Sequence, residues 1–207
     1  MILDIHTHDH LARRALISVN PMEFDPQLGA FYSVGIHPWR LPASDNDIKL
    51  LKSIALREDV LAIGECGIDK VRGGDLDEQM RVLIRHVELS ETVCKPLVLH
   101  CVKASNEIIS LRKRIRAVQP WVIHGFRGNA NVARQLLDAG MFLSFGEHFN
   151  ADAVKVVPSG RLLVETDEST MKICEIARNV AEVRGVSCKE LEANVLQTVQ
   201  VLLHRML

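Results

Sequence analysis

The sequence predicts an α/β protein built as a (β/α)8 TIM barrel, distorted at its start, in a single domain spanning residues 1–207. Eight short apolar runs, rich in β-branched residues, follow one another along the chain. Such runs are typical of parallel strands that are buried on both faces. From the third run onward, helical patterns separate the runs. This alternation favours a closed barrel, and an open doubly wound sheet is the alternative.

Each expected element has its own signal in the sequence. The expected strands are Ile2–His6, Ala15–Val19, Phe31–Ile36, Val60–Gly64, Pro96–His100, Trp121–His124, Met141–Phe145 and Arg161–Glu165. Apolar residues at helical spacing predict helices over Asp45–Arg57, Asp75–Cys94, Ser105–Val118, Asn129–Ala139, Ala151–Val156, Thr170–Arg184 and Ser187–Met206. The last of these opens with Ser187 and Glu190, the pattern of a capping box.

The start of the chain is too short for a regular barrel. Only about eight residues separate the first two expected strands, and about eleven separate the second from the third. A parallel crossover with a full helix needs more residues than that. We therefore expect the first two crossover helices to be shortened or absent.

Composition excludes several classes of protein. With 25 basic and 26 acidic residues and a net charge of −1, the chain does not resemble proteins that coat nucleic acid. An enzyme that binds a few phosphates in one site stays possible. No apolar run could cross a membrane, and the N-terminus lacks a signal-peptide pattern. Five cysteines without a C-x-x-C pair argue against a disulfide framework, so we expect a reduced, cytoplasmic protein.

A pair of histidines ends the first expected strand. Strand alternation places His6 and His8 on one face, with Asp4 beneath them on the same face. Two imidazoles at a strand end are able to share one divalent ion, and a nearby carboxylate is able to orient a ring nitrogen. Paired histidines alone also occur in ordinary polar turns.

Four further strand ends carry residues that bind metals. Glu65 follows the fourth strand, His100 ends the fifth, His124 ends the sixth and Asp167 follows the eighth. In a (β/α)8 barrel these ends meet at the catalytic face. The sequence therefore predicts a metal site there, and the number of ligands suggests two divalent ions.

We expect the ions to share the six residues in two groups. The first group is His6, His8 and Asp167, the second is His100 and His124, and Glu65 lies between them as a bridge. Mixed histidine and carboxylate ligands fit Mg²⁺, Mn²⁺ or Zn²⁺ without choosing among them. Two such ions suit hydrolysis of a phosphoester by a metal-activated water.

Several motifs occur in an order that resembles a known family. They are the Asp-x-His-x-His start at Asp4, Gly35-Ile36-His37-Pro38-Trp39, Gly64-Glu65-Cys66-Gly67-Ile68-Asp69, His100, His124-Gly125-Phe126 and Glu165-Thr166-Asp167. Together they resemble the TatD family of metal-dependent deoxyribonucleases in the amidohydrolase superfamily. The resemblance implies a distorted TIM barrel, hydrolysis of DNA from its 3′ end, and metal ligands at the same six residues.

One departure from the family pattern and two other functions stay open. The family usually continues its fifth-strand histidine as Ser-Arg-Asp-Ala, whereas this chain has Cys101-Val102-Lys103-Ala104, where Lys103 is able to replace the arginine charge. The alternatives to a deoxyribonuclease are a hydrolase of another ester or amide, such as an aminoacyl ester on transfer RNA, and a non-enzymatic binding protein with a relic site. Glu65 stands where many dinuclear amidohydrolases bridge their ions with a modified lysine, which favours the phosphodiesterase.

Beyond the metal ligands, some residues have two interpretations. We expect Glu65, Asp167 and His37 to be catalytic, and His37, Lys103 and Arg127 to bind DNA or another phosphoester substrate. His37 is otherwise a loop histidine packed on Trp39, and Arg127 is otherwise an exposed arginine.

A further group of residues has structural interpretations or no assignment. Asp69 either supports the metal site or caps a loop, and Glu165 either lines the barrel interior or has a structural role. We expect His86 on the solvated face of its helix and Cys66 as a buried apolar residue. His10, His148 and His204 have no assignment, and the oligomeric state, monomer or dimer, is left open.

Overall fold

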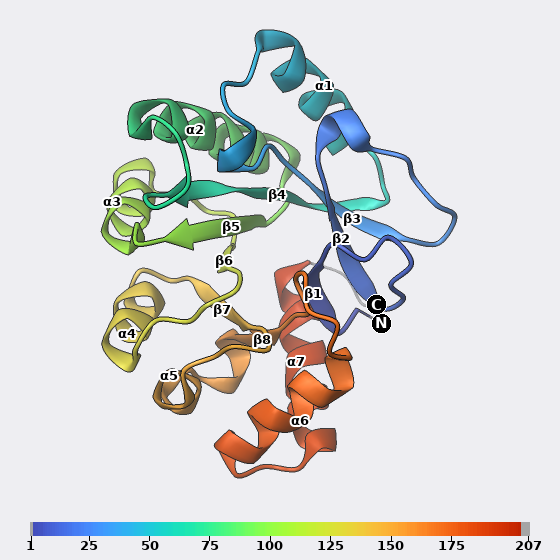
Figure 1. The fold of residues 1–207 in the computed structure, drawn as a ribbon, viewed down its shortest axis with the longest axis vertical. Coiled ribbons are helices and arrows are strands. Elements are labelled where there is room, and N and C mark those ends of the chain that lie inside the picture. Colours follow the sequence, from blue (N-terminus) through green and yellow to red (C-terminus); the bar gives the residue numbers. More distant parts are fainter. Residues whose placement is uncertain (1, 204–207) are drawn as a thin grey trace. The chain divides into compact units, whose positions relative to one another are not determined.

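The computed structural model describes residues 2–203. Its strands follow one another in a closed parallel barrel, which confirms the predicted fold class. Figure 1 shows the strands and helices along the chain. The strands are β1 (Asp4–Thr7), β2 (Ala15–Val19), β3 (Phe31–Val34), β4 (Val60–Asp69), β5 (Leu97–Val102), β6 (Trp121–Ile123), β7 (Phe142–Phe145) and β8 (Leu162–Val164). The α-helices are α1 (Asp45–Ala55), α2 (Leu76–Val93), α3 (Ser105–Ile115), α4 (Ala130–Asp138), α5 (Ala151–Val156), α6 (Ile173–Arg184) and α7 (Cys188–Leu202).

The first two connections between strands are short, as expected. Among the described residues, no α-helix precedes α1. The connection from β1 to β2 is a turn, and the connection from β2 to β3 holds only the short 3-10 helix η1 (Pro21–Glu23). The prediction that the first two crossover helices are shortened or absent is therefore confirmed.

Capping side chains set the starts of several helices. The Asp75 carboxylate accepts the Glu78 backbone N–H at the start of α2. The Ser187 hydroxyl accepts the Glu190 N–H at the start of α7, as the capping pattern predicted. The end of the last expected helix, beyond residue 203, lies outside the described residues.

Two compact units make up the chain. Unit 1 consists of Met1–Ile17 and Ile123–Leu207, and unit 2 consists of Ser18–Val122. In unit 1, β1 pairs in parallel with β2 and with β8, and β7 pairs with β8. The helices α6 and α7 pack together, and α7 also packs on β8. The single domain over residues 1–207 stays a prediction.

Unit 2 is built around a long, fully buried strand. β4 pairs in parallel with β3 and β5, and α2 packs on β4. The sequence predicted that this strand ends at Gly64, but β4 continues to Asp69. A Cβ on Gly67 would lie 2.0 Å from the backbone oxygen of His100, so glycine is required where β4 approaches β5. Glu65 and His100 consequently lie inside paired strands.

No helix in the described part of the chain combines the length and the apolar character needed to span a lipid bilayer.

Candidate functional site

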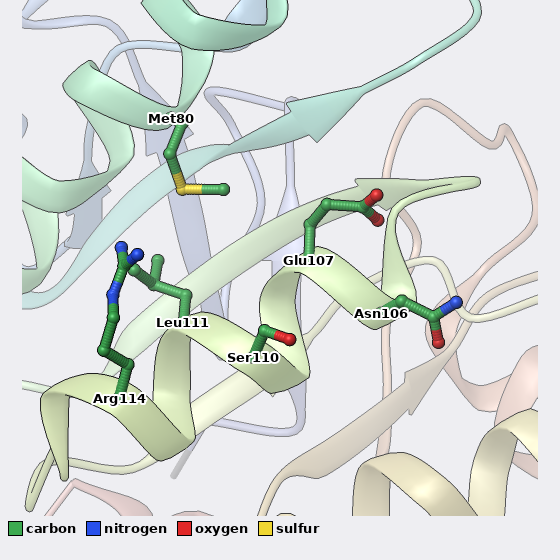
Figure 2. A pocket seen from close by; sticks show the side chains of 6 residues that line it. All are labelled: Met80, Asn106, Glu107, Ser110, Leu111 and Arg114. Atoms are coloured by element: carbon green, nitrogen blue, oxygen red, sulfur yellow. The ribbon is translucent and has the colours of Figure 1, made fainter.

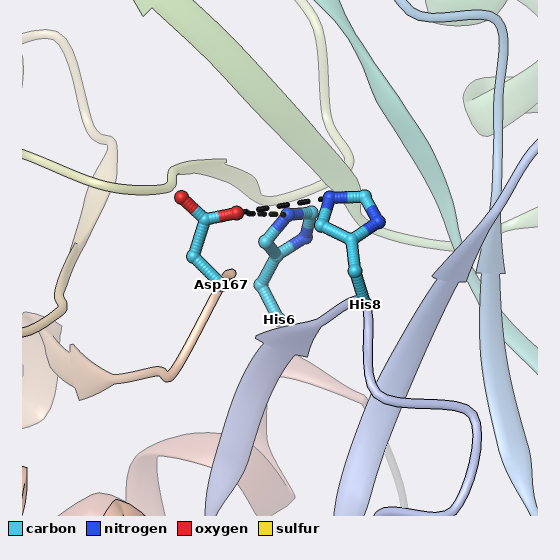
Figure 3. Close-up of side chains that lie close together, drawn as sticks. All are labelled: His6, His8 and Asp167. Atoms are coloured by element: carbon cyan, nitrogen blue, oxygen red, sulfur yellow. Dashed lines mark ion pairs between the residues drawn. The ribbon is translucent and has the colours of Figure 1, made fainter. Parts of the chain in front are cut away.

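The first cluster of candidate metal ligands lies in unit 1. The Nε2 atoms of His6 and His8 each lie 3.7 Å from Oδ1 of Asp167 (Figure 3). One ligand atom from each of the three residues falls within 4.8 Å of the others. His6 is fully buried, whereas the His8 side chain is 40% exposed. Two imidazole nitrogens and a carboxylate oxygen at this spacing fit a divalent ion.

Backbone pairing brings the first cluster together. The Asp167 N–H donates to the backbone oxygen of His6 at 2.9 Å, and the His8 N–H donates to the backbone oxygen of Asp167 at 3.1 Å. A β-bridge between Thr7 and Asp167 continues the pairing of β1 beyond the end of β8. Residues 161 positions apart in the sequence are therefore held by main-chain hydrogen bonds.

Asp4 supports this cluster through the backbone. The sequence suggested that its carboxylate orients a histidine ring. In the structure it accepts the N–H of His6 at 3.3 Å, the N–H of Thr166 at 3.1 Å and the Thr166 hydroxyl at 2.7 Å. Burial raises the pKa of Asp4 to about 7. Asp4 thus joins β1 to the segment after β8, and it positions His6 and Asp167 through the main chain.

His124 lies in the same unit, beside His6. Their ring centroids are 4.1 Å apart, and His124 Nδ1 lies 3.3 Å from Oε1 of the buried Glu165. The Gly125 N–H donates to the same oxygen at 2.6 Å. Burial acts to raise the pKa of Glu165, but His124, His6 and Ser144 together outweigh it, so the pKa lies below its ordinary value. A carboxylate on Nδ1 orients a histidine so that Nε2 is the nitrogen available to ligate an ion.

The second cluster lies in unit 2, around Glu65. Its Oε1 atom is 2.9 Å from His100 Nδ1 and 3.0 Å from His37 Nε2. These three residues also meet the spacing required of metal ligands. The other ring nitrogen of His37, Nδ1, accepts the N–H of Trp39 at 3.1 Å. Since Nδ1 accepts a hydrogen bond, Nε2 is the nitrogen of the neutral ring that carries the hydrogen, and this N–H donates a hydrogen bond to Glu65.

Asp69 connects the second cluster to a loop. Its Oδ2 accepts the indole N–H of Trp39 at 2.8 Å and lies 3.2 Å from His100 Nε2. Its Oδ1 accepts the N–H groups of Val71 and Arg72, each at 2.8 Å. Burial acts against the charged form, but these hydrogen bonds hold the pKa of Asp69 well below its usual range. Asp69 therefore caps the loop, as one of its two interpretations predicted, and it also contacts His100, while its support of a metal site stays a prediction.

The remaining candidates are Lys103, Arg127 and Cys66. Lys103 and Arg127 are exposed, and neither has a hydrogen bond or ion pair with a described residue. Their proposed contact with substrate stays a prediction. The thiol of Cys66 is buried and approaches the backbone oxygen of Val98 at 3.9 Å. Burial raises the pKa of this thiol, as expected for an apolar packing role.

His86 contradicts its prediction. It was expected on a solvated helix face, but it is fully buried. Its Nε2 accepts the backbone N–H of Ile36 at 2.9 Å, and its Nδ1 lies 2.8 Å from the backbone oxygen of Val82. Sequence reasoning missed this role because Ile36 and His86 are 50 positions apart.

A cavity in unit 2 lies apart from the candidate ligands. It has a volume of about 240 Å³ and lies between α2 and α3 (Figure 2). It is lined by Met80, Asn106, Glu107, Ser110, Leu111 and Arg114. None of these is a predicted site residue, and Glu107 is already paired with Lys70.

Known proteins resemble this chain along most of its length. A profile of the TatD related DNase family matches residues 22–204. An uncharacterized metal-dependent hydrolase of Buchnera aphidicola is 35% identical over 144 residues, which cover 65% of this chain and 54% of the relative. The 3′-5′ ssDNA/RNA exonuclease TatD of Cronobacter turicensis is 28% identical over 178 residues, which cover 77% of this chain and 65% of that protein. The chain thus spans 54% to 65% of the length of these relatives.

A solved structure has the same fold. The crystal structure of YjjV, a TatD homologue from Escherichia coli, aligns with a TM-score of 0.86 at 19% identity. The alignment covers 99% of this chain and 98% of that chain. At this identity the likeness establishes the fold of the chain.

Proposed function

The chain belongs to the TatD-related DNase family, and from this premise we propose that it is a divalent-metal-dependent hydrolase that cleaves the phosphodiester bonds of DNA from the 3′ end. The observation that carries the proposal is the convergence of His6 and His8 on one oxygen of Asp167. Glu65 and His100 form a second group of the same chemistry in unit 2. The exonuclease name of the Cronobacter relative supports a nucleic-acid substrate.

Six residues are the metal ligands in this proposal. Unit 1 contributes His6, His8, His124 and Asp167 as metal ligands, and unit 2 contributes Glu65 and His100. The bridging of two ions by Glu65, and the sharing of one ion by His100 and His124, stay predictions. When bound, divalent ions lower the pKa of a water molecule and polarise phosphoryl oxygens. Carboxylate and imidazole ligands leave Mg²⁺, Mn²⁺ and Zn²⁺ as the candidates.

The chain's own residues have complementary tasks in this proposal. Glu165 and Asp69 orient the rings of His124 and His100 by hydrogen bonding to the nitrogen that does not ligate. His37 is the proposed substrate contact. Because its Nδ1 accepts the Trp39 N–H, Nε2 is the nitrogen that donates: to Glu65 in this structure and, in the proposal, to a substrate phosphate. We also propose a cytoplasmic location, in line with five cysteines that form no C-x-x-C pair.

Activity after controlled metal loading tests the proposal. Metal-free protein is reloaded separately with Mg²⁺, Mn²⁺ and Zn²⁺ and incubated with 3′-labelled single-stranded DNA, duplex DNA, RNA and a simple phosphodiester. We expect stepwise release from the 3′ end of single-stranded DNA with at least one metal, and no release without metal. The double variant His6→Ala/His8→Ala is the control for contaminating nuclease. Hydrolysis of a simple ester or amide without cleavage of any phosphodiester would contradict the proposal.

A further inference from the structure

An arginine and a tryptophan stack beside the second cluster. The guanidinium carbon of Arg72 lies 3.7 Å from the centroid of the Trp39 ring. Trp39 belongs to the 3-10 helix η2 (Pro38–Arg40), and Arg72 lies in the loop after β4. The Trp39 side chain is 42% exposed, although the other tryptophan, Trp121, is fully buried. An exposed indole under a guanidinium forms a cation–π pair.

One buried carboxylate fixes both partners of the stack. Asp69 accepts the indole N–H of Trp39 through Oδ2 and the backbone N–H of Arg72 through Oδ1, each at 2.8 Å. The orientation of the ring and the path of the loop are therefore set together. Such fixing reduces the conformational entropy that Arg72 would lose on binding a ligand.

The charge of Arg72 has no counter-ion in the part of the chain that the structure describes. Neighbouring arginines differ in this respect, because Arg40 pairs with Glu23 at 3.0 Å and Arg81 pairs with Glu78 at 2.7 Å. The Arg72 guanidinium lies over the ring and carries its N–H donors in a fixed planar fork. This geometry suits the oxygens of a phosphate.

The stack borders the second cluster. The Trp39 ring centroid lies 4.6 Å from that of His37 and 5.6 Å from that of His100. We propose that Arg72, held on Trp39, binds a phosphate of the substrate chain that neighbours the phosphate being cleaved. The inference rests on the proposed function, since it takes the substrate to be a nucleic acid. It makes Arg72 and Trp39 determinants of specificity for chains with several phosphates.

Comparison of Arg72→Gln with Arg40→Gln tests the proposal. Both variants remove one positive charge, but Arg40 is already neutralised by Glu23. Metal-loaded protein is assayed on a single-stranded DNA 12-mer and on a substrate with one phosphodiester. We expect Arg72→Gln to lower the ratio of kcat/KM for the 12-mer to that for the single diester at least about tenfold. The change should be in KM, and Arg40→Gln should leave the ratio near that of the wild type.

Salt dependence gives a second readout. Loss of one phosphate contact should reduce the slope of log affinity against log salt by about 0.7 for a single strand. We expect this reduction for Arg72→Gln and for Trp39→Leu, which removes the ring. Trp39→Phe keeps an aromatic face and should retain part of the affinity. Equal effects of Arg72→Gln and Arg40→Gln, or an equal loss on both substrates, would overturn the proposal.

Binding without turnover separates this inference from the proposed function. The affinity of metal-free protein for a fluorescent single-stranded 12-mer is measured by anisotropy in the presence of a chelator. If the wild type binds the 12-mer, Arg72→Gln weakens binding and no metal supports cleavage, the phosphate site stands and the proposed hydrolysis fails. If the wild type cleaves DNA and Arg72→Gln matches it in both assays, only the phosphate site is wrong. If the wild type neither binds the 12-mer in the anisotropy measurement nor cleaves it in the activity assay, the phosphate site is also wrong.

Discussion

Glu65 is the residue at which two imidazoles meet in unit 2. His100 and His37 both contact its Oε1 atom. Replacing Glu65 with alanine removes the buried carboxylate that we propose as a ligand, so we expect loss of at least one ion per chain and activity at background level. Metal analysis by mass spectrometry, with activity on single-stranded DNA, checks both expectations. The shape-preserving variant Glu65→Gln should also lose metal, whereas Glu147→Gln, an exposed glutamate outside both clusters, should not. Retention of full metal content and near-normal turnover in Glu65→Ala would show that this carboxylate is not a ligand.

His37 shares the Glu65 carboxylate but has a different predicted role. As a substrate contact, it contributes a charge-assisted hydrogen bond of about 1.5–3 kcal/mol. His37→Ala should therefore leave the metal content unchanged and lower kcat/KM roughly ten- to a hundredfold. Metal analysis and steady-state kinetics on the same preparation separate the two roles. Loss of an ion from His37→Ala would instead make His37 a ligand beside Glu65 and His100.

The sequence predicted residues on strand ends better than residues that support them. His6, His8 and Asp167 follow strand patterns that are readable locally, and the structure brings them together. The partners of Asp4 and Asp69 include backbone N–H groups, the Thr166 hydroxyl, the Trp39 indole and the His100 ring, and they lie up to 162 positions away in the sequence. No periodicity reports which hydrogen bond a buried carboxylate accepts. For this reason the sequence suggested that Asp4 orients a histidine ring, whereas in the structure Asp4 accepts hydrogen bonds from two backbone N–H groups and from the Thr166 hydroxyl.

At the scale of elements, β4 shows that glycine does not always mark the end of a strand. Gly64 and Gly67 resemble turn residues, so the strand was expected to end at Gly64. Both glycines have positive φ angles and lie where a Cβ would meet the backbone of Val98 or His100. Glycine therefore serves the close approach of β4 to β5 at these positions. Close approach and chain reversal call for the same residue, and one sequence does not separate them.

The helix α2 supports the loop before His37 through one buried histidine. His86 accepts the Ile36 N–H, and the Gly35 backbone packs so closely on Gly64 and Glu65 that a Cβ would lie 2.6 Å away. His86→Leu removes the acceptor, and the buried Ile36 N–H then lacks it. We expect a loss of about 1–3 kcal/mol in the free energy of unfolding, measured by urea denaturation. His86→Gln offers an amide oxygen and should recover part of this loss, whereas equal stability of His86→Leu and the wild type would refute the role.

The same histidine predicts a pH dependence of stability. Burial lowers the pKa of His86 from 6.5 to about 4. The unfolded chain therefore takes up this proton first as the pH falls. The neutral form of His86 therefore contributes to the free energy of unfolding. This contribution is complete above about pH 6.5, is lost progressively toward pH 4, and amounts to about 3 kcal/mol. Urea denaturation of metal-free protein across this range should show a steeper loss in the wild type than in His86→Gln. Parallel profiles for the two proteins would exclude His86 as the cause.

For the whole molecule, the order of strands and helices and the missing early helices were predictable, because each strand is a local apolar run. The division of the chain into two units was not predictable from the sequence. Unit 1 joins residues 1–17 to residues 123–207, and their pairing depends on contacts between β1 and β8 that no local pattern encodes. The single-domain organisation and the sharing of ions between His100 and His124 concern both units, and they stay predictions.

Metal binding should stabilise the folded chain as a whole. His6 and Asp167 lie near opposite ends of the sequence and meet only when unit 1 is folded, so an ion bound there favours the folded state. Free metal at a hundred times its Kd adds about 2.7 kcal/mol. For a chain of this size, that raises Tm by about 5–10 °C. Differential scanning calorimetry with Mn²⁺ or Zn²⁺, and again with a chelator, measures the shift.

Two variants in unit 1 decide whether that shift comes from the predicted ligands. His8→Ala removes a predicted ligand whose side chain is 40% exposed, while its backbone hydrogen bond to Asp167 stays. Its metal-free Tm should therefore equal that of the wild type, and its metal-dependent rise should shrink by more than half. His148→Ala removes an exposed histidine whose recorded contact is Glu147, at 4.0 Å, and should keep the full rise. If both variants keep the rise, the metal binds elsewhere on the chain, and if both lose it, the stabilisation is a nonspecific effect of surface histidines.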